Sequence, residues 1–235
     1  MLQILKNTNT KATFFVLVHV AESHPELVLE IHHNGHEIAS HGYNHRFVYQ
    51  QSPEDFEADV SRSINLLSSI IGQPILGYRA PYFSITKKSL WAFPILQKLG
   101  LKYDSSIFPV HNHRYGIPDA SRLPYKTSEG LLELPLATFP VGKMNVPYAG
   151  GVYFRFFPYR VFSQMLHQLN KVNEFGVFYL HPWELDYQQP RNLNGKTIPF
   201  TLKFRHYWKL DKTAEKLSRL LNDFRFGSVE EVRGL

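Results

Sequence analysis

Short apolar segments alternate with amphipathic segments along most of this 235-residue chain. The apolar segments are short and continuously hydrophobic, which is typical of strands that are buried on both faces. Strands separated by helices predict an α/β fold with a parallel sheet or barrel and helices outside it. The predicted strands are residues 12–18, 36–40, 75–78, 101–104, 131–134 and 177–181.

The predicted helices have recognisable starts and ends. The clearest one has Ser52 as its N-cap and Pro53 at the first helical position, and its apolar side chains repeat at helical spacing as far as Ile71. A second helix is expected over residues 86–99, where Pro94 should cause a kink. Further helices are predicted over residues 23–35, 158–172 and 211–224, and residues 105–146 outside the strand at 131–134 are predicted to be irregular.

The composition excludes several kinds of site. The chain has no cysteine, so disulfides, zinc–thiolate sites and thiol nucleophiles are excluded, and a metal would need His, Asp or Glu ligands. The net charge of +6 is not concentrated in any run of like charge, so we expect no nucleic-acid partner. Solvated surface lysines are the simplest explanation of this charge, and help in holding an acidic polysaccharide is an alternative.

Membrane and export signals are not visible in the sequence. The longest apolar run, residues 14–18, is far shorter than the roughly 20 residues that a membrane span needs. Residues 1–9 lack the apolar region of a signal peptide. We therefore expect no membrane span and a cytoplasmic location.

Polar clusters follow four of the predicted strands. In barrels with helices outside, the chemistry lies on loops after the carboxyl ends of the strands, so clusters at these ends should converge on one rim. We therefore take this rim as the candidate site. The clusters are residues 40–45, 79–82, 104–106 and 181–184.

Two histidines in the first cluster have the spacing of a metal-binding pair. His41 and His45 flank a turn at Gly42, so both imidazoles could bind one metal and leave positions open for water and substrate. The pair His32 and His36 is rejected because it precedes its strand instead of following it. With twelve histidines in the chain such pairs also arise by chance, so surface histidines remain the alternative.

The other clusters allow both a structural and a chemical role. Arg79 could form a surface ion pair or hold a carboxylate ionised. Asp104 could cap a turn or orient a histidine. His181 could be a core imidazole or a proton donor. Tyr153 and Trp183 could belong to the core or stack on sugars.

Five segments occur in the order of a known set of motifs. They are residues 11–15, 40–45, 79–82, 103–106 and 180–181. Together they resemble the motifs of carbohydrate esterase family 4, the polysaccharide deacetylases related to chitooligosaccharide deacetylases. Residues 77–81, 103–109, 114–118 and 181–186 further resemble the branch found with exosortase-linked exopolysaccharide gene clusters. We interpret residues 1–235 as one domain, with the motifs over about residues 11–185 and a C-terminal extension over about residues 186–235.

The resemblance implies a distorted (β/α)7-type barrel and the hydrolysis of N-acetyl groups on a polysaccharide, which releases acetate. One divalent metal, commonly zinc, would be bound by His41 and His45. His181 would act as the general acid with Asp104 supporting it, and Arg79 would position the base.

Substrate contacts are implied for four further residues. The backbone N–H of Tyr82 would meet the oxyanion, next to Pro81 in the same motif. Tyr153 and Trp183 would lie against the sugar.

One part of the family pattern is absent from the sequence. The family has a first strand whose aspartates supply the third metal ligand and the general base, but no Asp or Glu precedes Glu22 here. We therefore expect an N-terminally truncated barrel with its first strand missing. Three interpretations remain: a deacetylase with a truncated start, a non-catalytic glycan-binding pseudoenzyme, and a fragment completed by a partner chain that supplies the missing strand.

Overall fold

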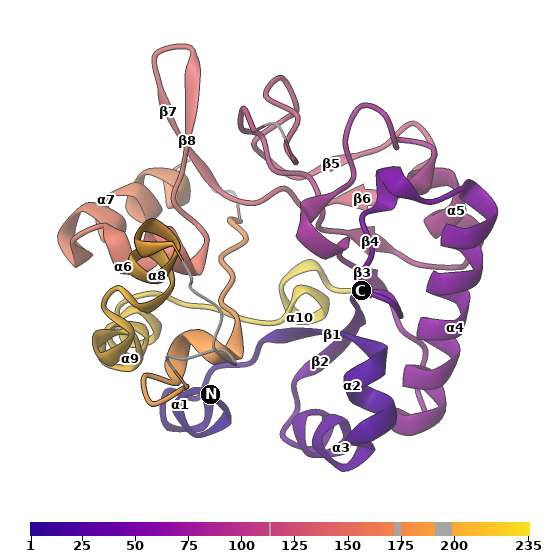
Figure 1. Ribbon diagram of the computed structural model, residues 1–235, viewed down its shortest axis with the longest axis horizontal. Helices are drawn as coiled ribbons and strands as arrows, with labels where there is room; N and C mark the ends of the chain where they lie inside the picture. The colour runs from indigo at the N-terminus through magenta and orange to yellow at the C-terminus, as the bar shows by residue number, and fades with distance from the viewer. Residues whose placement is uncertain (113, 172–174, 191–198) are drawn as a thin grey trace.

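The computed structural model describes residues 1–112, 114–171, 175–190 and 199–235. Its main sheet has six strands in the order β1-β2-β3-β4-β6-β5 (Figure 1). All neighbours in this sheet are parallel except β5 and β6, so the predicted α/β class with a parallel sheet is confirmed. The strands are β1 (Thr13–Val16), β2 (Glu37–Ser40), β3 (Gly77–Tyr78), β4 (Tyr103–Asp104), β5 (Tyr125–Lys126) and β6 (Leu132–Glu133).

The helices fall into two main groups (Figure 1). In the N-terminal half, α4 and α5 cover the outside of the sheet, and in the C-terminal half α6 to α9 form a second group (Figure 1). The helices are α1 (Leu2–Asn7), α2 (Val18–Ser23), α3 (Pro25–His33), α4 (Pro53–Ile71), α5 (Ala92–Lys98), α6 (Gly151–Phe156), α7 (Tyr159–Asn170), α8 (Phe200–Tyr207), α9 (Thr213–Asp223) and α10 (Val229–Arg233).

The predicted helix over residues 53–71 is confirmed in detail. The Ser52 hydroxyl accepts a hydrogen bond from the Asp55 N–H at 3.1 Å, which satisfies a donor of the first turn. Gly72 ends α4 with φ of +70°, a conformation that glycine adopts without a steric cost. The inner face of this helix buries Phe56, Val60 and Leu67.

Other predicted elements differ from the structure. The helix expected over residues 86–99 begins only at Ala92, because Ser89 binds the Thr86 N–H with its hydroxyl and holds residues 86–89 in a turn. Pro94 then lies in the first helical turn, where no backbone donor is needed, so it causes no kink. Part of the segment predicted to be irregular forms the hairpin of β7 (Thr138–Val141) and β8 (Met144–Pro147).

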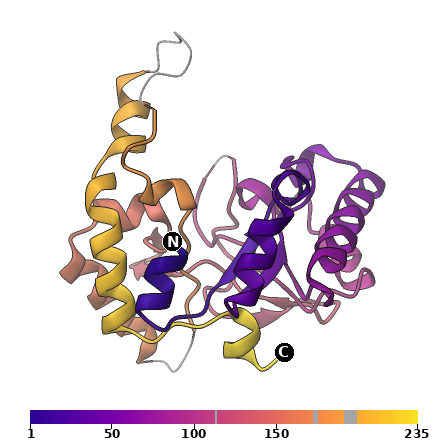
Figure 2. The ribbon, with the colours of Figure 1, turned by 90° about the horizontal axis from the view of Figure 1, so that it is seen from below.

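Apolar side chains form two main cores. The first packs the sheet against α2 to α5. The second packs α6, α7 and α9 against one another and includes Leu5 of α1, although α1 begins the chain. Figure 2 shows α1 beside α9, so the chain starts in the second core, builds the first one and returns.

The main sheet is open at β1. One edge of β1 pairs with β2, and within the described ranges no strand pairs with its other edge. The predicted strand at residues 177–181 is instead an extended segment, with isolated bridges to Leu136 and Gly150. The sheet therefore does not close into a barrel, and a large cavity separates β1 from this segment.

Candidate functional site

The cavity has a volume of about 1690 Å³ and brings most of the predicted site residues together. It is bounded by β1, by the loops after β2 and β3, by residues 176–183 and by part of α8. Asp104 and Pro81 are buried beside the cavity and do not line it. The predicted residues that do line it are His41, His45, Arg79, Tyr82, Tyr153, His181 and Trp183.

His41 and His45 face each other with ring centroids 5.2 Å apart. The Nδ1 of His41 lies 2.7 Å from the Arg79 carbonyl oxygen and therefore donates to it, which leaves the Nε2 lone pair available. Burial lowers the pKa of His41 to about 3, although this hydrogen bond opposes the shift. Burial also lowers the pKa of His45. Both imidazoles are therefore neutral at pH 7, the form that coordinates metals.

The loop between the two histidines is held by a residue that the sequence did not single out. Asp59 of α4 accepts hydrogen bonds from the Tyr43 N–H at 2.7 Å and the Asn44 N–H at 3.2 Å. Gly42 has φ of +75°, and His45 itself has φ of +52°. An acidic residue on a solvent-facing helix is common, so the sequence around Asp59 does not predict that it holds this loop. The contact is visible only in the folded structure.

Among the described residues, His41 and His45 are the candidate metal ligands of this site. Within the part of the chain that the structure describes, no group of three His, Asp or Glu side chains is arranged to hold a metal ion. His41 and His45 thus fit two ligands of a divalent metal, and a third protein ligand is not present among these residues. Catalytic zinc sites commonly have three protein ligands.

Arg79 is buried beside the histidines, and among the described residues no carboxylate forms an ion pair with it. Its Nε donates to the Ser105 carbonyl at 2.9 Å and its Nη2 to the Ser105 hydroxyl at 2.7 Å. The guanidinium also stacks on Phe15 of β1, 4.0 Å from the ring centroid. Burial lowers the pKa of Arg79 to about 10, so it stays charged at pH 7.

Asp104 supports the turn after β3 and makes no contact with His181. Its carboxylate accepts from the N–H and the hydroxyl of Ser106, and the Ser106 hydroxyl accepts from the Ala80 N–H at 2.7 Å. Glu133 lies beside Asp104 in β6, and burial together with the charge of Asp104 raises the pKa of Glu133. The contacts of Asp104 therefore do not include the expected support of His181. Glu133 is a second buried acid, and the sequence analysis did not identify it.

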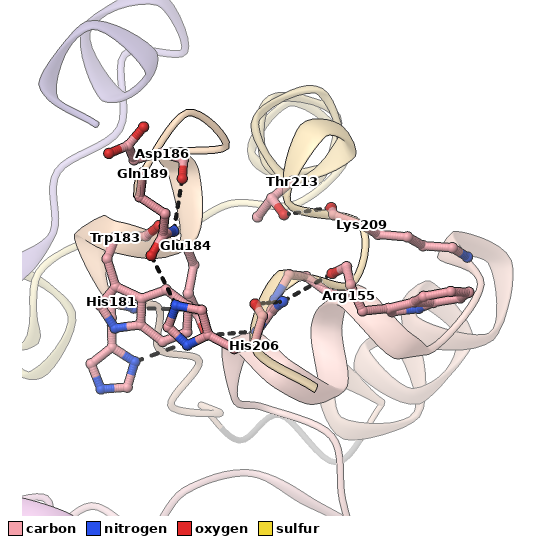
Figure 3. Close-up of polar contacts among 10 residues, drawn as sticks. Arg155, His181, Trp183, Glu184, Asp186, Gln189, His206, Lys209 and Thr213 are labelled. Carbon is pink, nitrogen blue, oxygen red and sulfur yellow. Dashed lines mark hydrogen bonds and ion pairs between the residues drawn. The ribbon is translucent and has the colours of Figure 1, made fainter. Parts of the chain in front are cut away.

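The acid next to His181 is Glu184. Its Oε1 lies 3.9 Å from the His181 Nδ1 and 3.5 Å from the Nη2 of Arg155 (Figure 3). The side chains of Arg155 and Glu184 are both only 1% exposed, whereas that of His181 is 53% exposed. Gly151 is required here, because a Cβ at this position would lie 1.5 Å from the Glu184 Oε2. The buried pair therefore places a carboxylate near the edge of an imidazole that is half exposed and lines the cavity.

Trp183 is stacked between protein side chains. The His206 ring lies parallel to it at 4.3 Å, and the His181 ring is stacked at 5.7 Å (Figure 3). Arg155 fixes the segment that carries His206, because its Nη1 donates to the carbonyls of His206 and Trp208. Trp183 therefore joins residues 181–184 to α8, and His206 covers one face of its ring.

The turn at Pro81 and Tyr82 presents an aromatic side chain to the cavity. Tyr82 and Phe83 have φ of +58° and +53°, a conformation that costs non-glycine residues about 1–3 kcal/mol each. This conformation turns the Tyr82 ring onto Phe47, at 4.3 Å, and His45, at 4.5 Å. Across the cavity, burial raises the pKa of Tyr153 to about 12.

Comparison of the sequence with protein families gives two matches that together span the chain. Residues 1–103 match the family described as "Polysaccharide deacetylase", and residues 105–233 match a "Domain of unknown function (DUF3473)". A peptidoglycan-N-acetylglucosamine deacetylase of Bacillus cereus is 32% identical over 93 residues. These residues are 39% of this chain and 34% of that protein, so the match spans about a third of the relative.

Solved structures show the same fold. A protein from Mycobacterium smegmatis assigned as a polysaccharide deacetylase has a TM-score of 0.66 at 22% identity, over 99% of this chain and 74% of that chain. A pseudoenzyme of carbohydrate esterase family 4 from Bacillus anthracis has a TM-score of 0.51 at 14% identity, over 98% of this chain and 58% of that one. The chain therefore belongs to the DUF3473 family, and its residues 1–103 are similar to polysaccharide deacetylases.

Proposed function

We propose that this protein hydrolyses N-acetyl groups on a polysaccharide in a metal-dependent reaction that releases acetate. The observation that carries the proposal is that two neutral histidines, a buried arginine and a half-exposed histidine meet in one cavity of a chain whose residues 1–103 are similar to polysaccharide deacetylases. We further propose that residues 1–235 act as one domain, because α1 and α9 pack together.

His41 and His45 are the proposed ligands of a divalent metal, and zinc is the proposed ion. Such a metal, when bound, polarises an acetamide carbonyl and lowers the pKa of a bound water. His181 lies at the wall of the same cavity and is the proposed acid that protonates the leaving amine. Arg79 contributes a fixed positive charge that attracts a carboxylate.

The general base and the third ligand are proposed to come from a segment outside the described ranges. The open edge of β1 and the segment at residues 177–180 border the cavity on opposite sides, and Arg79 stacks on Phe15 of β1. An extended segment placed between them would find unpaired backbone groups on β1. We propose that a strand with a carboxylate fills this position, supplied either by a longer form of the chain or by a partner chain.

A second candidate function is glycan binding without catalysis. It is favoured by the absence of a third His, Asp or Glu beside His41 and His45 among the residues that the structure describes. A pseudoenzyme with this fold supports the same alternative by analogy. The exopolysaccharide as substrate rests on the resemblance of residues 77–81, 103–109, 114–118 and 181–186.

The test is acetate release from N-acetylglucosamine oligomers in the presence of zinc or cobalt. His41→Ala removes one proposed ligand, and His33→Ala removes an exposed histidine that does not line the cavity. Release that is lost in the first variant and kept in the second supports the hydrolase. No release by protein that is folded by circular dichroism, together with measurable binding of the same oligomers, supports the non-catalytic function instead.

A further inference from the structure

The charged residues that line the cavity are almost all cations. Of the described residues, seven lysines and arginines line it, and a single carboxylate, that of Glu231, does so. The described residues that line the cavity therefore carry a formal charge of +6, which equals the formal net charge of the chain. The seven cations are Lys11, Arg79, Arg114, Lys203, Arg205, Arg225 and Arg233.

Three of these cations flank the histidines. On the side of His45, Arg114 lies 5.7 Å from the centroid of Phe47, and Phe47 stacks on Tyr82, which packs against His45. The opposite flank belongs to α8, which carries Lys203 and Arg205 next to His206.

The rings of His206 and Trp183 connect α8 to His181. The His206 ring stacks on Trp183, and Trp183 stacks on His181. The Arg205 charge also acts on Tyr153 in the cavity wall. The carboxylate of Glu231 lies elsewhere, on α10, which is attached to the sheet at Thr13 and Glu37.

Some cations elsewhere on the described surface form ion pairs with carboxylates. Arg62, Lys87 and Lys98 form ion pairs with Glu22, Asp119 and Glu57 respectively. For Arg114, Lys203 and Arg205, the contacts of the described residues include no ion pair with a carboxylate. Their charges are therefore available to a ligand in the cavity, where low-dielectric walls strengthen the attraction.

We propose that the polysaccharide bound in this cavity is anionic, with acidic groups on sugars on both sides of the N-acetylated unit. This inference rests on the proposed function and names its substrate class. A neutral chitin-like chain offers hydroxyl and amide groups and gives three unpaired cations nothing to neutralise. A carboxylate or sulfate on a neighbouring sugar accepts charge-assisted hydrogen bonds from arginine and lysine.

The test compares hexasaccharides by titration calorimetry at low and physiological salt, with no turnover required. One alternates N-acetylglucosamine with glucuronate, one is a neutral N-acetylglucosamine oligomer, and one is the neutral oligomer with sulfate esters. We expect the acidic oligomers to bind at least about tenfold more tightly than the neutral one, because three exposed ion pairs of modest strength add together. Salt should reduce this difference. Whichever acidic oligomer binds more tightly identifies the preferred anionic group, a carboxylate or a sulfate.

A triple variant tests the residues. Arg114→Gln, Lys203→Gln and Arg205→Gln together should remove the preference and leave binding of the neutral oligomer unchanged. The matched control is Lys102→Gln, Lys126→Gln and Lys143→Gln, which removes the same number of exposed cations outside the cavity. This control should keep the preference.

The inference is overturned if the wild type binds the neutral oligomer as tightly as the acidic ones, if none of them binds, or if both triple variants lose the preference equally. The proposed function fails separately. Selective binding of acidic oligomers with no acetate release from any of them would contradict the hydrolase and support the anionic ligand. Acetate release without selective binding of the acidic oligomers would support the hydrolase and contradict the anionic ligand.

Discussion

Burial sets the protonation state of His41, which has a consequence for stability at low pH. The folded pKa is about 3, and the value in an unfolded chain is near 6.5. Between these values the unfolded chain binds a proton that the folded protein excludes, so this group destabilises the fold progressively as the pH falls through that window. The effect fades as the pH rises above 6.5.

We therefore predict that the urea midpoint of the metal-free protein falls between pH 7 and pH 4, and that it falls less in His41→Gln. Glutamine can still donate to the Arg79 carbonyl and does not titrate. The exposed His33→Gln variant should behave like the wild type. Equal falls in the wild type and in His41→Gln would show that His41 is not held neutral.

The ion pair between Arg155 and Glu184 is expected to matter far more than the surface pairs. Both side chains are 1% exposed, so Glu184→Gln leaves a buried guanidinium without its counter-charge. We predict a loss of about 3 kcal/mol in the free energy of unfolding, measured with urea. The exposed pair of Lys87 and Asp119 is the control, and Asp119→Asn should cause a much smaller loss. Similar losses in both variants would contradict this account.

At the scale of elements, α10 is attached to the sheet through one buried acid. Glu37 of β2 accepts from the hydroxyls of Thr13 and Tyr103 and from the Glu230 N–H at the start of α10. The Thr13 hydroxyl in turn accepts from the Val229 N–H at 2.8 Å. Strands β1, β2 and β4 and helix α10 thus meet at the Glu37 carboxylate.

We predict that Glu37→Gln lowers the free energy of unfolding by about 2 kcal/mol, because an amide cannot accept all three hydrogen bonds. The amides of residues 229–233 should also exchange with deuterium faster, which mass spectrometry can follow. Glu230→Gln changes an exposed acid in the same helix and keeps its backbone donor, so it should change neither quantity. Unaltered exchange in Glu37→Gln would mean that other contacts hold α10.

The elements also show where sequence signals are strong and where they fail. The helix at residues 53–71 was predictable because its cap, its proline, its periodicity and its final glycine all agree. The hairpin of β7 and β8 was missed because its strands are short and contain Pro140 and Pro147, which argue against a strand. Residues 177–181 have the composition of a buried strand, but whether they join a sheet depends on neighbours that are distant in sequence.

At the scale of the whole molecule, α1 connects the two cores. Leu5 is 5% exposed and belongs to the second core, whereas Leu2 of the same helix packs against the first. We predict that Leu5→Ala costs about 2–4 kcal/mol and reduces the amide protection of α7 and α9 more than that of α4. Leu2→Ala is the matched substitution, and it should reduce the amide protection of α4 more than that of α7 and α9. A uniform loss of protection in both variants would show that the two cores unfold as one unit.

The surface of the whole molecule bears on one earlier expectation. Within the described ranges, no helix is long and apolar enough to cross a membrane. Cations such as Lys11 and Arg225 line the cavity and are also exposed, so solvated surface charge remains one explanation of the positive net charge.

The sequence by itself determined the α/β class, the order of the elements and the positions of the polar clusters after the strands. These follow from local patterns, since hydrophobic periodicity and caps act over a few residues. Only the tertiary structure decided that Glu184 and not Asp104 stands beside His181, that Asp59 holds the His41 loop, and that the unpaired cations gather in one cavity. Such contacts join residues far apart in the chain, and their partners depend on packing that no local pattern encodes.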